Sequence, residues 1–364
     1  MNTSSSSSWS FFFRVLLKTA VLFALCNGVF AAVQPLEWLG QWSLYNHVLH
    51  GRMRLPYGEN PAVAYNLSTN NLPAMLESHR ISQPKAADEF RVVVLGDSSV
   101  WGWLLDNDAT LTSQLNKQGL HTADGRQVVF YNLGYPIISA AKDLLILDAV
   151  LAHEPDLILW LVTLDALPID KQLFPPLVQN NPARMRPLIE QYNLQLDPHD
   201  ARFVEPSFWQ QTIVGQRRNL ADWLRLQLLA PAWHTTAIDQ ALPADYERRQ
   251  SDFEEDVSWQ GFDEPTTLTT ADLALDVLQA GVTLAGDIPL ILINEPIFVS
   301  DGQNSNLRYN SFYPRWAYDQ YRTLLAEEAE HRGWRYLDLW DAAPPEEFTD
   351  TPVHLTAEGT NRLA

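Results

Sequence analysis

Two separated motifs carry the residue types that nucleophilic catalysis by a serine requires. The first, the Gly-Asp-Ser-Ser sequence at residues 96–99, follows an apolar run and so places Ser98 at the end of a predicted buried strand. The second places Asp350 four residues before His354, near the end of the chain. A histidine can take the proton of a serine hydroxyl, and a carboxylate can orient that histidine. These residues therefore predict acyl transfer through a covalent intermediate on Ser98.

The positions of these residues favour this pairing over simpler readings of each motif. His354 follows the last predicted strand as Ser98 follows the first, and the carboxyl ends of parallel strands meet at one edge of a sheet. His199 also has aspartates beside it, but it lies in an irregular part of the chain. The alternative for the first motif is a plain strand-to-helix junction, in which Asp97 or Ser98 only caps the following helix.

The elements that must position these residues alternate between strands and helices. Helical patterns cover residues 140–153, 216–229, 271–284 and 315–331, and such helices connect neighbouring parallel strands. The order predicts an α/β fold in three layers, α/β/α, with a mostly parallel five-stranded sheet. Its strands are short apolar runs bounded by polar residues or glycine, at residues 90–95, 127–132, 156–162, 288–293 and 334–340.

The chain divides into three predicted parts. Residues 1–33 form an apolar N-terminal segment, residues 34–89 are a lead-in rich in proline, asparagine and aromatic residues, and residues 90–364 form the main domain. Within that domain, residues 166–270 break the alternation of strands and helices and read as an insertion. A connection of this length favours a cap or lid over the site, and the alternative is a surface excursion that only stabilises the fold.

The N-terminal segment predicts the cellular compartment. Arg14 and Lys18 precede the apolar residues 19–33, an order typical of a cytoplasmic N-terminus with the downstream chain translocated. Residues 11–33 are just long enough to span a bilayer as one helix. We therefore expect a single-pass cell-membrane protein with an extracytoplasmic domain. The same features describe a cleaved signal peptide, which would make the protein secreted, and a buried core helix is the third reading.

Composition excludes several classes of partner. The chain has 25 Lys and Arg residues against 44 Asp and Glu residues, a formal net charge of −19. Such a surface repels phosphate backbones, so nucleic acid is not expected as a partner. The single cysteine, Cys26, lies in the apolar segment, so no disulfide or thiolate metal site is expected elsewhere. Neither a zinc-like ligand spacing nor a phosphate-binding loop is present, and no metal or organic cofactor is predicted.

The motifs and their order resemble those of the SGNH/GDSL hydrolase superfamily. Besides Gly-Asp-Ser-Ser and the Asp…His pair before a C-terminal helix, Asn-Leu-Gly follows the second strand at residues 132–134. The resemblance implies a flavodoxin-like three-layer fold and an esterase mechanism. It also implies that Ser98 is the nucleophile, that His354 is the general base, and that Asp350 orients it. The backbone N–H groups of Ser98 and Gly134 would form part of the oxyanion hole.

Two departures from the family pattern stand out. The family's third motif supplies an asparagine whose amide donates to the oxyanion, and its loss typically lowers the rate about 100- to 1000-fold. Here the third strand is followed by Thr163 and then Asp165, and an ionised Asp165 would repel the forming charge. Thr163 and Asn294, which both follow strands, are the candidate replacements; the alternatives are a capping threonine and a turn asparagine. In the second departure, Asp350 lies one residue further from His354 than the family's aspartate does.

The segment of residues 300–319 concentrates amide, arginine and aromatic side chains after the fourth strand. Aromatic faces with amides suit a carbohydrate, so Arg308, Tyr309 and Trp316 are candidate substrate-binding residues. The alternative is a long loop held by its own aromatic residues against the next helix. Trp101 and Trp103 similarly either line the cleft or belong to the core.

Taken together, the sequence predicts a serine esterase acting on an extracytoplasmic ester, either a small molecule or an O-acylated cell-surface glycan. An O-acyltransferase would use the same acyl-enzyme and differ only in the acceptor. A second alternative is a non-catalytic glycan-binding or assembly protein with a degenerate oxyanion hole. Whichever of these functions holds, the expected contact of the protein with a membrane is through its N-terminal helix.

Overall fold

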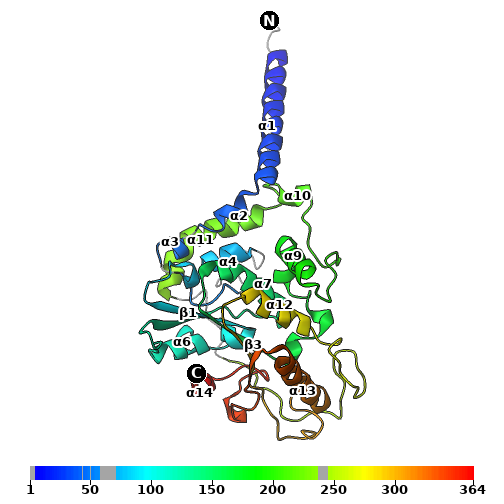
Figure 1. Cartoon of the computed structure of the whole chain (residues 1–364). Helices are drawn as coiled ribbons and strands as arrows, with labels where there is room; N and C mark the ends of the chain where they lie inside the picture. Colours follow the sequence, from blue (N-terminus) through cyan, green and yellow to red (C-terminus); the bar gives the residue numbers. More distant parts are fainter. Residues whose placement is uncertain (1–4, 43, 50, 58–70, 237–244) are drawn as a thin grey trace.

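A five-stranded parallel sheet forms the centre of the protein (Figure 1). The computed structural model describes residues 5–42, 44–49, 51–57, 71–236 and 245–364. Each strand predicted from the sequence is confirmed, with ends that differ by at most two residues. The strands are β1 (Glu89–Leu95), β2 (Gln127–Asn132), β3 (Leu157–Val162), β4 (Leu290–Asn294) and β5 (Arg335–Asp338).

The strand order is β2-β1-β3-β4-β5, so the direction of winding reverses after β2. This is the flavodoxin-like order, in which the switch point lies between β1 and β3. Helices that leave the two strands at a switch point go to opposite faces of the sheet and open a crevice at the carboxyl ends. Ser98 follows β1 and therefore lies at this crevice.

Helices cover both faces of the sheet and confirm the three-layer prediction. One face carries α4 (Leu72–Glu77), α7 (Ala140–Val150), α12 (Leu275–Ala285) and α13 (Arg315–Arg332), and the other carries α6 (Leu111–Lys117) and α14 (Ala357–Leu363). The helix predicted from residue 271 begins at Leu275 instead, because Leu273 is held in a bridge to Pro168. Single turns of 3₁₀ helix lie at Arg80–Ser82, Asn107–Ala109, Leu151–His153, Leu164–Ala166, Ile169–Lys171 and Pro345–Glu347.

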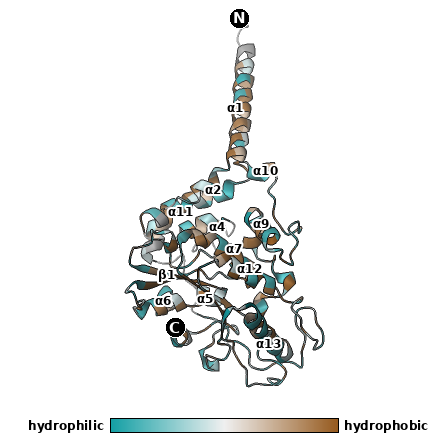
Figure 2. Cartoon of the chain, in the orientation of Figure 1, coloured by the Kyte–Doolittle hydropathy of each residue, from teal (hydrophilic) through white to brown (hydrophobic). Residues whose placement is uncertain are grey.

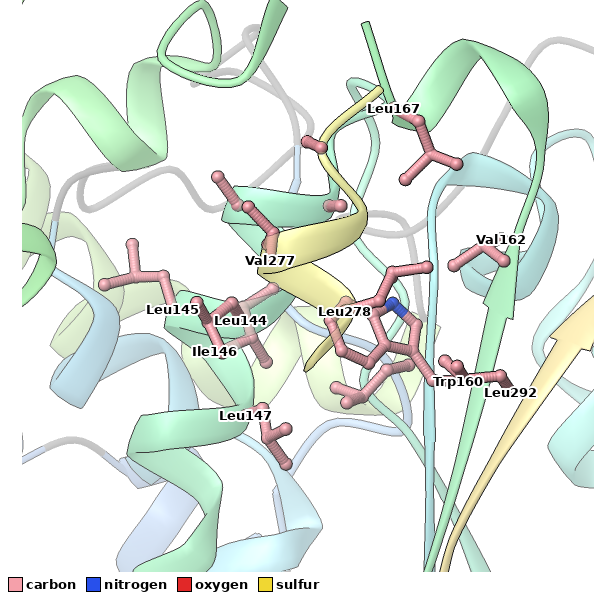
Figure 3. Packing of buried hydrophobic residues seen from close by; sticks show 14 of the residues in the cluster. Leu144, Leu145, Ile146, Leu147, Trp160, Val162, Leu167, Val277, Leu278 and Leu292 are labelled. Carbon is pink, nitrogen blue, oxygen red and sulfur yellow. The ribbon is translucent and has the colours of Figure 1, made fainter. Parts of the chain in front are cut away.

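Alternate residues of β1 pack into two separate cores, as a strand buried on both faces requires. Val93 and Leu95 belong to the larger core, and Val92 and Val94 to the smaller one. In the larger core, leucines of α7 and α12 surround Trp160 of β3 (Figure 3). The indole N–H of Trp160 donates to the carboxylate of Asp143 at 3.2 Å, which pairs the one polar atom of that buried ring.

The N-terminal helix α1 (Ser5–Val33) projects from the domain, and most of its surface is apolar (Figures 1 and 2). Residues 9–33 of α1 are long and apolar enough to cross a membrane, and few of them are buried. Helices α2 (Pro35–Leu39), α10 (Phe208–Gln211) and α11 (Arg217–Thr236) lie at its base. The short helix α3 (Leu44–His47) packs beside α11.

The stretch predicted as an insertion, residues 166–270, has two halves that lie in different parts of the protein. It contains α8 (Pro176–Gln179), α9 (Pro182–Tyr192), α10 and α11, and then returns without regular structure along residues 300–316. Residues 237–244 of this stretch, and residues 58–70 of the lead-in, lie outside the described part of the chain. The first half of the stretch therefore reaches α1, and the second half fastens a loop beyond the carboxyl end of β4.

Candidate active site

Ser98 is the first residue of α5 (Ser98–Trp101), immediately beyond the carboxyl end of β1. The chain turns at Gly96, whose φ of 154° and contact with α5 exclude a side chain: a Cβ there would lie 2.6 Å from Cγ2 of Val100. The carboxylate of Asp97 accepts the backbone N–H of Ser99 at 2.7 Å and so caps α5. Because Asp97 is the cap, the partly exposed hydroxyl of Ser98 is left for another partner.

That partner is His354. The Oγ atom of Ser98 lies 2.7 Å from Nε2 of His354, and Nδ1 of the same ring lies 2.7 Å from Oδ1 of Asp350. A carboxylate can only accept, so Nδ1 carries the imidazole proton and Nε2 accepts from the serine hydroxyl. The structure thus brings together the three residues expected to act as nucleophile, base and orienting acid, in one hydrogen-bonded chain.

The loop that carries His354 explains how Asp350 reaches it across four residues. The N–H of Thr349 donates to the carbonyl of His354 at 2.8 Å, and the N–H of Thr356 donates to the carbonyl of Glu347 at 2.8 Å. These bonds tie the two arms of a tight loop, so Asp350 and His354 face each other at its mouth. The extra residue relative to the family spacing is therefore absorbed within the loop.

The electrostatics of the pair keep the acid ionised. Burial on its own would raise the pKa of the Asp350 carboxyl, but the hydrogen bond and charge of His354 outweigh burial and lower it. Asp350 is therefore an anion at neutral pH and stabilises the imidazolium that forms when His354 takes a proton.

The two tryptophans after Ser98 have different places. Trp101 is buried, and its indole N–H donates to the carbonyl of Leu55 at 2.8 Å. Trp103 is partly exposed and stacks on the His354 ring, with centroids 6.1 Å apart and planes 29° apart. Trp101 therefore belongs to the core, whereas Trp103 forms one wall beside the imidazole.

The two backbone donors expected for the oxyanion hole differ in their present partners. Ser98 opens α5, so its N–H has no acceptor within the helix. Gly134 lies against α5, where a Cβ would come within 2.4 Å of the backbone nitrogen of Trp101. Its N–H, however, donates to Oδ1 of Asn132 at 3.1 Å. The structure therefore offers the Ser98 N–H for an oxyanion and shows the Gly134 N–H already engaged.

The structure gives neither Asn294 nor Thr163 access to a substrate. Both side chains are fully buried. The amide of Asn294 donates to Asp338 at 2.8 Å and its oxygen accepts from the hydroxyl of Tyr321 at 3.0 Å. Thr163 shares a 2.9 Å hydrogen bond with Tyr313. The physical reason is the same for both: tyrosines on and before α13 cover the ends of β3 and β4 and take up the polar atoms there.

The carboxylate of Asp165, which could have opposed an oxyanion, is paired. Its Oδ1 lies 2.6 Å from Nζ of Lys171 and accepts from the amide of Gln260 at 3.0 Å. Burial raises the pKa of this carboxyl, although Lys171 acts against the rise. The nearby ammonium group of Lys171 thus balances the charge of the Asp165 carboxylate.

Arg308, Tyr309 and Trp316 use their polar atoms within the protein. The buried Arg308 guanidinium donates to the backbone carbonyl groups of Asn310, Asp256 and Ser311. The buried Tyr309 donates its hydroxyl to Asp319 at 2.7 Å, and the indole of Trp316 donates to the carbonyl of Val257 at 2.7 Å. Arg308 and Trp316 are thus bound to the returning half of residues 166–270. Tyr309 holds the loop against α13 and matches the alternative of a loop held by its own aromatic residues.

Sequence reasoning missed Glu295, which directly follows β4. Its buried carboxyl accepts a short hydrogen bond from the hydroxyl of Ser99, the neighbour of the candidate nucleophile. Burial, reinforced by the charge of Asp97, raises its pKa well above the ordinary value. The available signal was its position, since β1 and β4 both release acidic residues at the same edge of the sheet.

Metal ligation is not part of this arrangement as far as the structure describes the chain. Among the described residues, no group of three or more His, Cys, Asp or Glu side chains is placed to hold a metal ion.

Comparison with known proteins gives distant structural neighbours only. No family model and no curated protein matches the chain. A carbohydrate acetylesterase family member from Sinorhizobium meliloti is 12% identical, with a TM-score of 0.31 over 75% of this chain and 93% of the other. A protein from Desulfitobacterium hafniense DCB-2, described as lipolytic and of the G-D-S-L family, is 14% identical, with a TM-score of 0.30 over 75% and 94%. Likeness at this level settles neither activity nor substrate, which must be argued from this chain's own residues.

Proposed function

We propose that the protein is a serine hydrolase of ester bonds, with Ser98 as nucleophile. The observation that supports this most strongly is the continuous hydrogen-bonded chain from Ser98 through His354 to Asp350, at 2.7 Å in each step. It lies at the topological switch point of the sheet, where open α/β folds bind their ligands. A capping role alone does not account for it, because Asp97 already caps α5.

The geometry supports a two-step mechanism. Ser98 Oγ attacks the ester carbonyl carbon while Nε2 of His354 takes the hydroxyl proton, and the N–H of Ser98 stabilises the tetrahedral oxyanion. The intermediate collapses, His354 returns the proton to the leaving alcohol, and an acyl-enzyme remains. Water then attacks the acyl carbon as His354 takes its proton, and the second collapse releases the acid and restores Ser98. Asp350 holds the proton on Nδ1 throughout.

The wall of the site bears on the substrate class. Trp103 presents a partly exposed indole beside His354, and flat aromatic faces are common in sites that bind sugar rings. The net charge of −19 disfavours anionic substrates in the absence of a local basic pocket. We therefore favour a neutral ester, with an O-acylated glycan as the first class to examine.

The location of the domain is part of the same proposal. Helix α1 is exposed and long enough to cross a bilayer, and Arg14 and Lys18 lie toward its N-terminal end. This order favours a cytoplasmic N-terminus with the domain outside the cytoplasm. Protease added to intact cells should then digest the domain, whereas resistance until the membrane is opened would contradict it.

Hydrolysis by the purified full-length chain tests the activity. In detergent, we expect release of acid from short-chain aryl esters and from acetylated oligosaccharides, with activity lost on Ser98→Ala. Ser311→Ala, an exposed serine outside the triad, is the matched control and should retain full activity. Equal activity of wild type and Ser98→Ala, or no turnover by folded wild-type protein on any ester, would contradict the proposal. Adding free oligosaccharide as an acceptor reveals acyl transfer.

A further inference from the structure

Large apolar side chains are exposed together at the base of α1. We define this collar as the exposed apolar residues of α2, α10, α11 and the turns beside them. Trp209 is 76% exposed and Leu228 is 79% exposed, values that a soluble surface rarely shows for several such residues in one region. Figures 1 and 2 show these helices grouped where α1 meets the domain. The collar comprises Trp38, Trp42, Phe208, Trp209, Val214, Leu224, Leu228 and Leu229.

Helix α11 is apolar on two faces, and only one of them is covered. Leu226 and Ala230 are buried and pack against Leu44 of α3 and Leu49 just after it. Leu224 and Leu228, four residues apart, share the uncovered side. The covered face and a 2.8 Å hydrogen bond from the Trp223 indole to the carbonyl of Leu39 hold α11 in place. The exposed stripe is thus presented by a fixed helix.

The collar is continuous with the apolar surface of α1. Asn27 and Ala31, in the last turns of α1, are buried, and Oδ1 of Asn27 accepts the N–H of Val214 at 3.4 Å. The 18 residues from Trp9 to Cys26 remain uncovered and rise about 27 Å, close to the thickness of a bilayer's hydrocarbon core. Arg14 and Lys18 lie within this stretch, and their long side chains can extend toward its N-terminal end. The collar therefore lies at the level where that core would end, and tryptophans are typical of this boundary.

Charge on α11 fits the same partner. The helix carries Arg217, Arg218 and Arg225 but only one carboxylate, Asp222, in a chain that is strongly acidic overall. A helix with an apolar stripe and cations beside it is typical of binding in the interfacial plane of a membrane with anionic lipids. Asp222 pairs with Arg225 at 3.3 Å, so Arg217 and Arg218 carry the excess positive charge of the helix.

We propose that the collar docks on the membrane surface that faces the domain, with Leu224, Leu228 and Trp209 in the interfacial layer. This inference rests on the proposed anchoring through α1. Docking at a second region fixes the orientation of the domain, which a single projecting helix would leave free to swing. The first half of residues 166–270 thereby acts as a membrane-facing support.

Lipid-borne quenchers test the docking in the full-length protein. The chain is reconstituted in vesicles of phosphatidylethanolamine and phosphatidylglycerol that contain doxyl-labelled lipid. A fluorophore is attached in separate samples to native Cys26, to Leu228→Cys with Cys26→Ser, or to Leu120→Cys with Cys26→Ser. Leu120 is exposed and follows α6, across the sheet from α4 and α7. We expect quenching at position 228 to be about fivefold stronger than at position 120 and similar to that at Cys26.

The three labels separate the possible outcomes. Quenching at Cys26 with none above the Leu120 level at position 228 would overturn docking and leave anchoring intact. Absence of quenching at Cys26 would overturn both. Crosslinking between two copies of the unlabelled Leu228→Cys variant, without lipid quenching of the labelled one, would show that a second copy of the chain covers the collar. That result would also overturn the proposal. Weaker quenching at position 228 in vesicles of phosphatidylcholine alone would support the role of the arginines, and an unchanged value would contradict it.

Discussion

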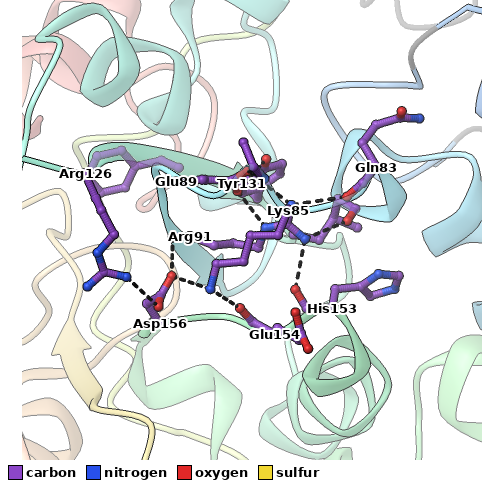
Figure 4. A network of polar contacts seen from close by, with 12 residues as sticks. Gln83, Lys85, Glu89, Arg91, Arg126, Tyr131, His153, Glu154 and Asp156 are labelled. Carbon is purple, nitrogen blue, oxygen red and sulfur yellow. Dashed lines mark hydrogen bonds and ion pairs between the residues drawn. The ribbon is translucent and has the colours of Figure 1, made fainter.

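Polar and charged residues cluster at both ends of the sheet, and the two clusters differ in whether they leave a reactive group exposed. At the amino ends of the strands, Arg91 is buried and donates to the carboxylate of Glu89 at 2.6 Å and to backbone carbonyl groups (Figure 4). Tyr131 donates to Glu89 at 2.9 Å, and Asp156 accepts from the N–H of Arg91 and from Lys85. Every partner in this network belongs to the protein itself.

The cluster at the carboxyl ends leaves a reactive group at the surface. His354 bonds to Asp350 on one nitrogen and to Ser98 on the other, and Ser98 is partly exposed. A buried, saturated network stabilises a fold, whereas a base hydrogen-bonded to an accessible hydroxyl can react with a ligand. The comparison shows that exposure of a hydrogen-bonded hydroxyl, rather than density of charge, distinguishes the candidate site.

The largest effect is expected from removing the base. His354→Ala should lower kcat/KM for ester hydrolysis by about 10⁴-fold, because the serine loses its proton acceptor while binding is retained. His199→Ala is the matched control, since His199 is exposed and also lies near aspartates. Steady-state kinetics measure both variants. A loss below about tenfold for His354→Ala would contradict the role of the triad.

At the other end of the sheet, the expected effect is on stability. Arg91→Met strands the buried Glu89 carboxylate and should lower the free energy of unfolding by about 3–5 kcal/mol. Arg126→Met removes more exposed ion pairs, with Asp124 and Asp156, and should lower the stability much less than Arg91→Met does. Urea unfolding gives the stabilities, and hydrolysis per folded molecule should be unchanged in both. Reduced activity of folded Arg91→Met protein would break the distinction between the two ends.

The buried His79, beside the network at the amino ends, should make the stability of the fold depend on pH. His79, whose ring contacts that of Tyr131, is fully buried, and burial lowers its pKa from 6.5 to about 3. Because the folded-state pKa lies below the unfolded one, its stability contribution is complete above pH 6.5 and is lost as the pH falls toward 3. The loss is at most about 1.4 kcal/mol per pH unit. His79→Asn should flatten this dependence between pH 6.5 and 5; an unchanged slope in urea unfolding would contradict it.

The smallest effect is expected at Glu295. Because burial raises its pKa and so disfavours the charged carboxylate, its replacement by glutamine should cost below about 1 kcal/mol, since the amide oxygen can still accept from Ser99. Glu295→Ala leaves that hydroxyl unpaired and should cost about 1–3 kcal/mol. Thermal unfolding distinguishes the two. A large loss for Glu295→Gln would show that the carboxyl is ionised.

The sequence predicts the centre of the sheet well because β1, β3 and β4 are apolar runs that are mostly buried. It brings Ser98, Asp350 and His354 to one edge because parallel strands end there. The partners of Asn294 and Arg308 could not be predicted, since they come from α13 and from residues near 256, which lie far away along the chain. Glu295 was missed because its contact with Ser99 and the raised pKa of its carboxyl depend on burial, which spacing does not reveal.

The measurement that tests the central claim most directly is covalent labelling of the purified chain with a fluorophosphonate, followed by peptide mapping. A phosphonylated serine forms only where a base activates the hydroxyl. We predict a single adduct on Ser98 that is absent in His354→Ala. Folded wild-type protein that stays unlabelled, or an adduct on another serine, would contradict the assignment of Ser98 as the nucleophile.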